Sequence, residues 1–439
     1  MNIGGCQTRN VASLRGYPGN ARTHSAKQIG QIAKSIKRFG FTNPVLISDD
    51  DEIIAGHGRV KAAQHLGLAE VPVIRLSHLS AEERRAYVLA DNKLALNAGW
   101  DNDILAIELQ HVVDFNFDVD ALGFSTCEMD LVFGAAQKSA VEATIDRDDE
   151  VPPVAKIPVS RIGDMWILGR HRLVCGDAQD ITAYFELLED GDADLLFTDP
   201  PYNVPINGHV SGLGKHKHRE FAFASGEMDR VEFTAFLATA LACASAKLRD
   251  GAIAYVCMDW RHMREVLDAG ALIFTEFKNL CVWNKGNADM GTFYRSKHEL
   301  VFVFKSGTAP HTNNFGLGDK GRYRTNVWDH PGISSRSATR DAELAMHPTV
   351  KPVRLVQDAI EDCSHRNGII LDCFGGSGTT LIAAERCGRR ARLIEYDPLY
   401  CDTIIRRYEA LTGKRATLGK GGASFDSVAA QRKEVREIA

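Results

Sequence analysis

A chain of 439 residues is longer than one hydrophobic core usually supports, so its length predicts two or three domains. Hydrophobic residues make up 44% of the chain and charged residues 25%, as in soluble globular proteins, and no apolar run approaches the roughly 18 residues of a membrane span. The formal charge of -5 excludes a protein that coats nucleic acid with its whole surface, but it allows a local basic face. Because the first 15 residues lack the apolar core of a secretory signal, we expect a cytoplasmic protein.

The N-terminal part begins with a helix pattern and continues with short strands and helices. Apolar residues recur at helical spacing over Ala26 to Phe39. After this helix the sequence predicts strands over Asn43 to Ile47 and Ile53 to Ala55. It then predicts a helix over Val60 to Leu66 and a third strand over Val71 to Leu76. Two polar loops are expected, Gly56-His57-Gly58-Arg59 and Ala90-Asp91-Asn92-Lys93.

A break in the apolar pattern between Gln137 and Ser160 predicts a linker. The segment turns acidic over Asp146 to Glu150 and then carries three prolines. We therefore predict an N-terminal domain over residues 1–135, a linker over 136–160, a second domain over 161–415, and a tail over 416–439 that forms a short helix or frays.

The second domain alternates short apolar runs with helical patterns. This alternation predicts an α/β fold with a doubly wound, mostly parallel sheet and helices on both faces. The expected strands are Arg172 to Cys175, Asp194 to Thr198, Ala252 to Met258, Phe277 to Trp283, Leu300 to Phe304, Gly368 to Cys373 and Ala391 to Glu395. The expected helices are Asp180 to Glu189, Arg230 to Lys247, Pro352 to Cys363, Thr379 to Cys387 and Pro398 to Leu411. Ligands of such sheets bind at the carboxyl ends of the strands.

One candidate ligand loop follows the strand over Gly368 to Cys373 and runs directly into a helix. It reads Phe374-Gly375-Gly376-Ser377-Gly378-Thr379-Thr380. Glycines let the backbone adopt positive φ and approach a ligand closely, and a helix N-terminus favours an anionic group. The next strand ends at Glu395, whose carboxylate can accept hydrogen bonds from ribose hydroxyls. With Asp372 before the loop, the unit predicts a site for an adenosine-containing cofactor, and a tight turn without a ligand is the alternative.

A second candidate loop follows the strand over Asp194 to Thr198 and reads Asp199-Pro200-Pro201-Tyr202. Consecutive prolines fix φ and lack N–H donors, so the loop offers mainly acceptors. An exocyclic base amine is a poor nucleophile because its lone pair is delocalised into the ring. The carboxylate of Asp199 and the carbonyl of Pro200 can accept its hydrogens and restore electron density on nitrogen, while Tyr202 offers a face on which a flipped-out base stacks. Taken alone, the motif fits a rigid turn equally well.

These motifs and their order resemble the beta group of the amino-group DNA methyltransferases, whose catalytic motif is (D/N/S)-P-P-(Y/F/W) and whose cofactor motif is F-x-G-x-G. The cofactor motif falls on Phe374, Gly376 and Gly378, about 175 residues after the catalytic motif. The resemblance covers residues 161–415 and implies transfer of a methyl group from S-adenosylmethionine to a base amine of duplex DNA. Asp199 at the first catalytic position favours adenine N6 as the target, and cytosine N4 is the alternative.

The resemblance also implies roles for individual residues. Asp177 is similar to the residue near the cofactor adenine, and Lys351, within His347 to Pro352, is similar to the element that holds the cofactor's methionine end. The block Val282 to Lys285 with His298-Glu299-Leu300 resembles a further family block. The implied catalytic residues are Asp199, Pro200, Pro201 and Tyr202. The implied cofactor-binding residues are Asp177, Lys351, Asp372, Phe374, Gly376, Gly378, Thr379 and Glu395.

Double-stranded DNA is the implied partner, and a homodimer is compatible with the sequence. Basic residues that we expect to contact phosphates are Lys215, Lys217, Arg219, Arg322 and Arg324, although solvated surface charge explains either group equally well. Target recognition is expected over about residues 203–346. The ten cysteines include no C-x-x-C pair, so the sequence predicts no metal site, and the methyl transfer requires no metal.

The N-terminal domain resembles the ParB-like domain of chromosome-partition proteins, which is grouped with sulfiredoxins, over about Asn20 to Asn97. Four residues match its G-E-R-R-x-x-A-A signature, and Asp91 and Asn92 fall where the family has Glu-Asn; the four are Gly56, Arg59, Ala62 and Ala63. His57 and Gly58 depart from the signature, so the resemblance does not extend to nucleotide hydrolysis. Arg59 and the helix start after it offer a site for a phosphate of a nucleotide or of DNA, and a tight turn without a ligand fits the same glycines.

A function of another class is also compatible with this domain order. In that alternative the chain is a DNA-binding regulator led by its ParB-like domain, and the methylase half is inactive. The undamaged catalytic and glycine loops argue against it, because loss of activity usually leaves damaged motifs.

Overall fold

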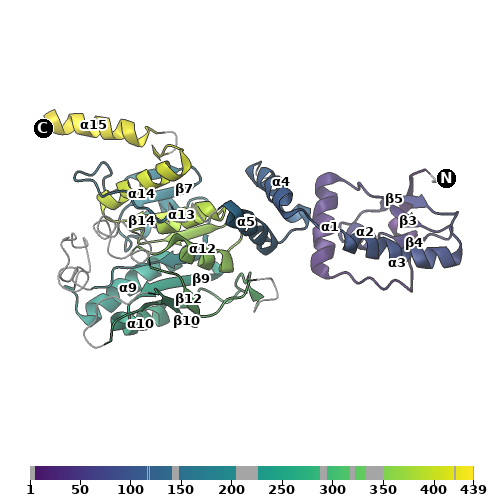
Figure 1. The fold of residues 1–439 in the computed structure, drawn as a ribbon, viewed down its shortest axis with the longest axis horizontal. Coiled ribbons are helices and arrows are strands. Elements are labelled where there is room, and N and C mark those ends of the chain that lie inside the picture. The colour runs from purple at the N-terminus through teal and green to yellow at the C-terminus, as the bar shows by residue number, and fades with distance from the viewer. Residues whose placement is uncertain are drawn as a thin grey trace. The chain divides into compact units, whose positions relative to one another are not determined.

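The structure is a computed structural model that describes residues 5–115, 117, 119–140, 148–203, 226–286, 294–316, 322–332, 350–419 and 422–438. Contacts divide the chain into two units, Met1–Ser139 and Ala140–Ala439, which are coloured from purple to blue and from blue to yellow in Figure 1. Within these ranges no helix is long and apolar enough to cross a membrane. The described ranges also hold no group of three or more side chains placed to bind a metal ion.

Unit 1 contains a mixed five-stranded sheet with the order β1-β5-β3-β4-β2. Its strands are β1 (Gln7–Asn10), β2 (Arg15–Gly16), β3 (Val45–Ile47), β4 (Glu52–Ala55) and β5 (Glu70–Arg75), and its first helices are α1 (Ala26–Phe39), α2 (His57–His65) and α3 (Ala81–Asn97). The ends of α1 follow from local chemistry, because Ser25 caps the first turn and Gly40 adopts a φ of 80° after the last. The core lies between α2 and the sheet, where Val45, Ile47, Val71 and Val73 are fully buried.

The expected loop over Ala90 to Lys93 is wrong, because these residues lie inside α3. Ser80 and Glu83 form a capping box that starts this helix, and the residues after it are good helix formers. The side chain of Asn92 donates to the carbonyl of Val88 one turn earlier, so its polar group is satisfied without leaving the helix.

A helical pair completes unit 1. The pair is formed by α4 (Asn102–Asp114) and α5 (Thr126–Ala140), and the short 3-10 helix η2 (Val119–Leu122) lies between them in the chain. Leu105 and Leu109 of α4 pack against Met129 of α5 in a small separate core. This pair is held to α1 by the hydrogen bond from the Gln31 side chain to the carbonyl of Gly123, at 3.0 Å.

Ten strands within the described residues form the sheet of unit 2, in the order β12-β10-β11-β9-β8-β13-β14-β7-β6-β15. They are β6 (Met165–Leu168), β7 (His171–Cys175), β8 (Ala193–Thr198), β9 (Leu248–Met258), β10 (Glu276–Asn284), β11 (His298–Lys305), β12 (Val327–Asp329), β13 (Ile369–Asp372), β14 (Arg390–Glu395) and β15 (Thr417–Leu418). The central run from β9 to β7 is parallel throughout, and antiparallel pairs stand on both sides of it.

Helices cover both faces of this sheet (Figure 1). They are α7 (Ile181–Leu187), α9 (Arg230–Ser245), α10 (Met263–Ile273), α12 (Val353–Cys363), α13 (Thr379–Arg386) and α14 (Pro398–Thr412), and α15 (Phe425–Ile438) follows at the C-terminal end. One core cluster lies under α12, α13 and α14, and a second lies under α7, α9 and α10. The predicted doubly wound α/β fold after a small α+β unit is therefore confirmed.

The short strands β6, β12 and β15 were not predicted, since two to four residues carry too little periodicity to be recognised alone. The helix α10 was not predicted either. The predicted linker over 136–160 also packs on unit 2 at two places. The backbone N–H of Val353 at the start of α12 donates to Asp149, and those of Val159 and Ser160 donate to Asp402 of α14. These contacts order the segment after residue 147 on unit 2.

Candidate active site

Four neighbouring parallel strands bring the predicted site residues to one edge of the sheet. Strand β8 ends before Asp199, β13 ends at Asp372, β14 ends at Glu395, and β7 ends shortly before Asp177. Because the carboxyl ends of parallel strands lie at the same edge, side chains far apart in the sequence meet there. The glycine loop and the Asp199 loop therefore both lie at the carboxyl edge of the sheet, as the sequence predicts.

The glycine loop between β13 and α13 has the backbone that its sequence predicts. Gly376 and Gly378 have φ values of 51° and 84°, and Gly378 is the N-cap of α13. A Cβ atom at Gly378 would lie 3.1 Å from Ile404. From within the protein, the buried guanidinium of Arg407 donates to the carbonyl of Ser377 at 3.1 Å. The loop is therefore held in place while the N-terminus of α13 stays directed to the sheet edge.

Two carboxylates border this loop. Glu395 accepts hydrogen bonds from the backbone N–H groups of Gly376 at 2.7 Å and Asp397 at 2.8 Å. Asp372 accepts from the hydroxyls of Thr380 at 2.7 Å and Thr198 at 3.1 Å. Burial raises the pKa of both carboxyl groups to about 7, against the hydrogen bonds that favour their ionised forms. Because Thr198 immediately precedes Asp199, the bond to Asp372 ties the catalytic loop to the glycine loop.

The carboxylate of Asp199 lies in a cluster of buried polar groups. Its Oδ1 accepts from the hydroxyl of Tyr202 at 2.8 Å, and its Oδ2 pairs with the ammonium of Lys351 at 2.6 Å. The side chain of Asp199 is 25% exposed, whereas that of Lys351 is only 4% exposed. Burial raises the pKa of Asp199, while Lys351 acts in the opposite direction. Asp199 is thus an ion-paired acceptor that can be reached from solvent.

Two residues of this cluster were not assigned a role from the sequence. Glu299 of β11 pairs through Oε2 with Lys351 at 2.9 Å and through Oε1 with Lys285 at 2.6 Å. The hydroxyl of Tyr202 also lies 3.0 Å from Oε2 of Glu299. Burial raises the pKa of Glu299, but the two ammonium groups outweigh this effect and hold the pKa at about 2. The block resemblance around His298-Glu299-Leu300 was the one signal in the sequence that pointed to this carboxylate.

Asn203 closes the catalytic loop. Its φ of 50° lies in the left-handed region, which asparagine tolerates better than most residues. Its side-chain oxygen accepts from the backbone N–H groups of Gly226 and Met228, and its amide donates to the carbonyl of Met228. These bonds fix Asn203 against Gly226 and Met228, and with it the preceding Tyr202 beside Asp199.

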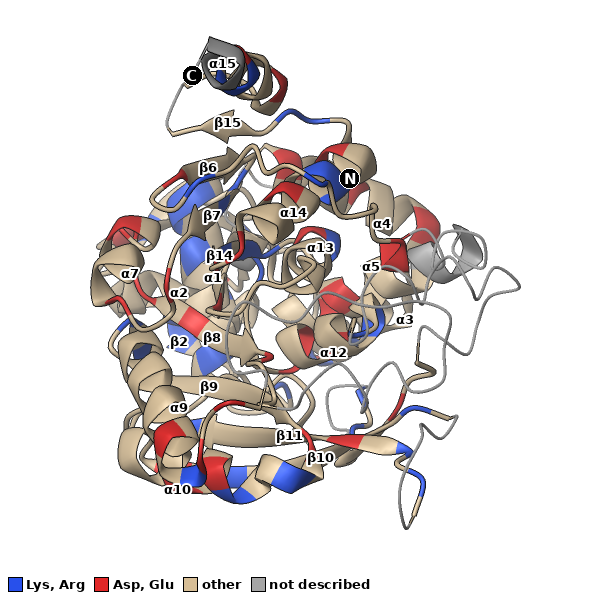
Figure 2. Cartoon of the chain, turned by 90° about the vertical axis from the view of Figure 1, so that its left-hand side faces the viewer, with Lys and Arg blue, Asp and Glu red and all other residues tan. Residues whose placement is uncertain are grey.

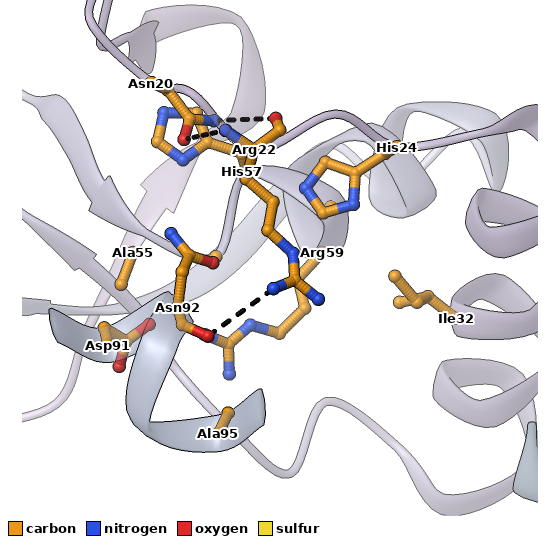
Figure 3. Close-up of a pocket in the computed structure, with 12 residues that line it drawn as sticks. Asn20, Arg22, His24, Ile32, Ala55, His57, Arg59, Asp91, Asn92 and Ala95 are labelled. Atoms are coloured by element: carbon orange, nitrogen blue, oxygen red, sulfur yellow. Dashed lines mark hydrogen bonds between the residues drawn. The ribbon is translucent and has the colours of Figure 1, made fainter. Parts of the chain in front are cut away.

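Unit 1 contains a pocket of about 220 Å³ at the signature residues. The loop expected over Gly56 to Arg59 is wrong, because His57 to Arg59 already form the first turn of α2. Figure 3 shows Arg59, Asp91 and Asn92 around the pocket, together with Arg22 and His24. Gly56 caps α2 with a φ of 104°, so the N-terminus of that helix opens at the pocket. The structure therefore brings together the residues Gly56, Arg59, Asp91 and Asn92 that the resemblance had singled out.

His57 occupies the place of the signature glutamate and has a local structural task. Burial, His24 and Lys61 lower its pKa, which favours the neutral ring. Its Nε2 accepts a hydrogen bond from the backbone N–H of Tyr17 at 3.2 Å. A neutral imidazole bound in this way does not supply the negative charge that a glutamate would bring to the pocket.

Comparison with known families assigns both units. Residues 193–406 match the DNA methylase family of the N6/N4 type, a range that runs from β8 to α14 and includes both loops. Residues 6–93 match the ParB N-terminal domain. The chain contains a DNA methylase domain of the N6/N4 type and a ParB-like N-terminal domain. The predicted resemblance to both families is thereby confirmed, with adenine and cytosine as targets not distinguished at this level.

Individual relatives match different parts of the chain. The ParB-like nuclease domain-containing protein YnaK of Escherichia coli is 54% identical over 77 residues, which are 18% of this chain and 88% of that protein. The type II methyltransferase M2.MboI of Moraxella bovis is 27% identical over 252 residues, which are 54% of this chain and 87% of that protein. Among solved structures, the complex of M1.HpyAVI with SAM is similar over 54% of this chain and 97% of its own, with 19% identity and a TM-score of 0.40.

A further match covers the helical pair, which had no predicted role. Residues 103–162 match a ParB-methyltransferase helix-turn-helix domain, and this range includes part of the predicted linker. The segment 101–140 has eight Asp and Glu residues and a single lysine, whereas residues 5–48 have seven Lys and Arg residues and no Asp or Glu. Since phosphate contacts require basic side chains, the composition of the helical pair does not favour it as the phosphate-binding part of unit 1.

The prediction that Arg322 and Arg324 contact DNA requires correction. Both side chains are largely buried, at 10% and 17% exposure, in an ion-pair cluster with helix α12. Figure 2 shows the acidic residues of this helix in red. Arg322 pairs with Glu361 at 2.7 Å and with Asp362 at 2.9 Å, and Arg324 pairs with Asp362 at 2.8 Å. Carboxylates of the protein thus take the place that phosphates were expected to occupy. The other predicted phosphate contacts, Lys215, Lys217 and Arg219, lie outside the described residues.

We expect Arg322→Ala to destabilise the methylase without weakening its binding to DNA. Removing the guanidinium leaves Glu361 and Asp362 buried with less counter-charge, which costs about 3 kcal/mol in the free energy of unfolding. Urea unfolding and a DNA titration measure the two effects. Arg230→Ala, which removes an exposed ion pair on α9, is the control and should change stability by less than about 1 kcal/mol. A loss of DNA affinity at unchanged stability would contradict the structural role.

Proposed function

We propose that the methylase transfers a methyl group from S-adenosylmethionine to N6 of an adenine that has been flipped out of duplex DNA. The observation that carries this proposal is the position of Asp199, an acceptor carboxylate at the end of β8 that is tied through Thr198 and Asp372 to the glycine loop. Its Oδ2 pairs with Lys351, while 25% of its side chain remains open to solvent. An acceptor in this position suits an amine that must gain electron density as it attacks.

The residues at the sheet edge fit S-adenosylmethionine, the methyl donor of this family. Gly376 and Gly378 leave the backbone of the loop without side chains, and Glu395 lies beside the loop as an acceptor for ribose hydroxyls. Thr379 completes the proposed cofactor set with Asp177, Asp372 and Phe374. Lys351, which was also expected in this set, directs its ammonium to Asp199, Glu299 and Tyr202 instead. Once bound, the cofactor supplies a methyl group on a positively charged sulfur, which makes that group reactive toward a neutral amine.

The protein's own residues would act on the amine and the base. Asp199 would accept one hydrogen of the amine and take up the proton released when the N–C bond forms. The Pro200 carbonyl would accept the second hydrogen, and Tyr202 would stack on the flipped base. The hydroxyl of Tyr202 lies 2.8 Å from Asp199, which supports a role for the tyrosine beside the amine that Asp199 would accept from.

Nucleoside analysis tests the proposal directly. Purified methylase is incubated with duplex DNA of varied sequence and labelled cofactor, and the DNA is then digested to nucleosides. N6-methyladenine is the expected product. N4-methylcytosine alone would overturn the choice of base, and no methylated nucleoside from protein that binds both cofactor and DNA would favour a DNA-binding regulator instead.

Cofactor binding should become tighter as the pH rises from 6 to 8. The pKa of Glu395 is raised to about 7, so the carboxyl group is mostly protonated at pH 6 and cannot accept from two ribose hydroxyls. If binding requires the ionised form, one-proton linkage predicts a Kd about tenfold weaker at pH 6 than at pH 8. Calorimetric titration with S-adenosylhomocysteine measures this ratio.

Glu395→Gln is the matched variant for this titration. We expect it to bind more weakly at pH 8 and to lose the pH dependence, because an amide does not titrate. Asp372 has a similar pKa, but its carboxylate is almost fully buried and bonded to two threonine hydroxyls, so the variant separates the two groups. A tenfold ratio that persists in Glu395→Gln would assign the effect to a group other than Glu395.

Unit 1 would support the methylase by binding phosphate. We propose that Arg59 and the N-terminus of α2 hold a phosphate of a nucleotide or of DNA in the pocket of Figure 3. Duplex DNA as the partner, and a homodimer as the assembly, belong to the same proposal.

A further inference from the structure

The cluster around Asp199 contains more charge than the proposed reaction uses. We call the five residues that form it the lysine cluster: Asp199, Tyr202, Lys285, Glu299 and Lys351. They come from the loop after β8, the end of β10, strand β11 and the segment before α12. Two carboxylates and two ammonium groups balance one another, so the cluster is neutral when all four are ionised.

Lys351 uses its three N–H groups on three residues of this cluster. Its Nζ lies 2.6 Å from Asp199, 2.9 Å from Glu299 and 3.0 Å from the hydroxyl of Tyr202. The exposed fractions of the side chains are 4% for Lys351, 8% for Glu299 and 25% for Asp199. A substrate amine therefore reaches the cluster through Asp199, and when it donates to Oδ2 it competes with Lys351 for that oxygen.

A displaced Lys351 needs another counter-charge, because an unpaired ammonium in a buried site costs several kcal/mol. Glu299 already provides one at 2.9 Å. Lys285 holds the other oxygen of Glu299 at 2.6 Å, which prevents this carboxylate from turning away. The ring of Trp283 lies 5.7 Å from the ammonium of Lys351 and 5.2 Å from that of Lys285, and it adds cation–π stabilisation to both.

We propose that Glu299 is a positioning residue for methyl transfer: it holds Lys351 and Tyr202 beside Asp199 and remains the counter-charge of Lys351 when the substrate amine takes its place on Asp199. The inference rests on the proposed function, because it assigns a task in the same reaction. Glu299 touches neither the base nor the methyl group. Its effect reaches the reaction through Lys351 and Tyr202.

The pH dependence of kcat separates this role from a purely structural one. If Glu299 holds Lys351 beside Asp199, Glu299→Gln lets Lys351 move away, burial then raises the pKa of Asp199, and the acidic limb of the profile moves to higher pH. If Lys351 keeps its place without Glu299, Asp199 loses only a neighbouring carboxylate. Its pKa then falls, and the acidic limb moves to lower pH.

The test compares full-length Glu299→Gln, Glu299→Asp and wild type in steady-state methylation of duplex DNA between pH 5 and 9. We expect kcat of Glu299→Gln to fall about 100-fold, the size of effect seen when one preorganised polar contact is lost. KM values for DNA and cofactor should stay within about threefold, and the acidic limb should shift to higher pH. Glu299→Asp keeps the charge and should recover about tenfold in kcat. Glu265→Gln, a buried glutamate on α10 outside the site, is the matched control and should behave as wild type.

A kcat of Glu299→Gln within threefold of wild type, or an acidic limb that moves to lower pH, would overturn the inference. If Glu299→Gln loses its cooperative melting transition, the kcat and the acidic limb of Glu299→Asp decide whether the positioning role holds. A tenfold loss of kcat at an unchanged limb supports the positioning role, and a wild-type kcat overturns it. A wild-type protein that methylates no base would instead overturn the proposed function.

Discussion

Asp199→Ala is expected to lower methyl transfer by at least about 1000-fold while cofactor affinity changes by less than about threefold. The side chain supplies the acceptor for the amine hydrogen and for the released proton, and no neighbouring carboxylate among the described residues is as exposed at this point of the cluster. The glycine loop does not depend on it, because Asp372 bonds to Thr198 and Thr380 through their hydroxyls. Single-turnover methylation and calorimetric cofactor titration measure the two quantities.

Two further variants sharpen this result. Asp199→Asn keeps an acceptor oxygen but removes the charge, so we expect a smaller loss of about 10- to 100-fold. Asp268→Ala removes an exposed carboxylate from α10 and should retain full activity. A fully active Asp199→Ala would refute the assigned role, and a variant that loses cofactor binding together with activity would point to a collapsed loop.

Lys351→Met should lower both stability and activity. Without the ammonium, Asp199 and Glu299 lie in a buried site with only Lys285 as a neighbouring positive charge, and we expect a loss of about 3 kcal/mol in the free energy of unfolding at pH 8. The pKa of Asp199 would rise, because burial is then no longer opposed by Lys351. A group whose folded pKa is raised loses its contribution to stability as the pH increases through that pKa, so the destabilisation should be smaller at pH 5 than at pH 8.

The same shift affects the reaction. Since Asp199 must be ionised to accept from the amine, the acidic limb of the rate profile of Lys351→Met should move to higher pH. Urea unfolding at two pH values and a pH profile of kcat measure these effects. Lys278→Met, which removes a surface ion pair on β10, is the control and should change stability by less than about 1 kcal/mol. An equal loss of stability at pH 5 and pH 8 would contradict the role of the two carboxylates.

The local sequence was sufficient to predict a helix end or a turn wherever the residues that determine it lie within a few positions of one another. The bounds of α1 are set by Ser25 and Gly40, and the turn into α13 is set by Gly376 and Gly378, so both were predictable from residue type and spacing. The same kind of signal misled at Ala90 to Lys93, where polar residues suggested a loop. There the capping box at Ser80 had already started a helix that continues through them.

The sequence by itself determined the two loops, their order and the α/β fold, because motif spacing and apolar periodicity are local properties of the chain. Only the tertiary structure decided which charges meet. Lys351 pairs with Asp199 across 152 residues, and Arg322 pairs with carboxylates of α12 instead of facing solvent. Such pairs depend on strand order and on how each helix packs on the sheet, neither of which a short pattern contains. The role of Glu299 follows from the same fact, since strand β11 brings its carboxylate to a lysine that precedes α12.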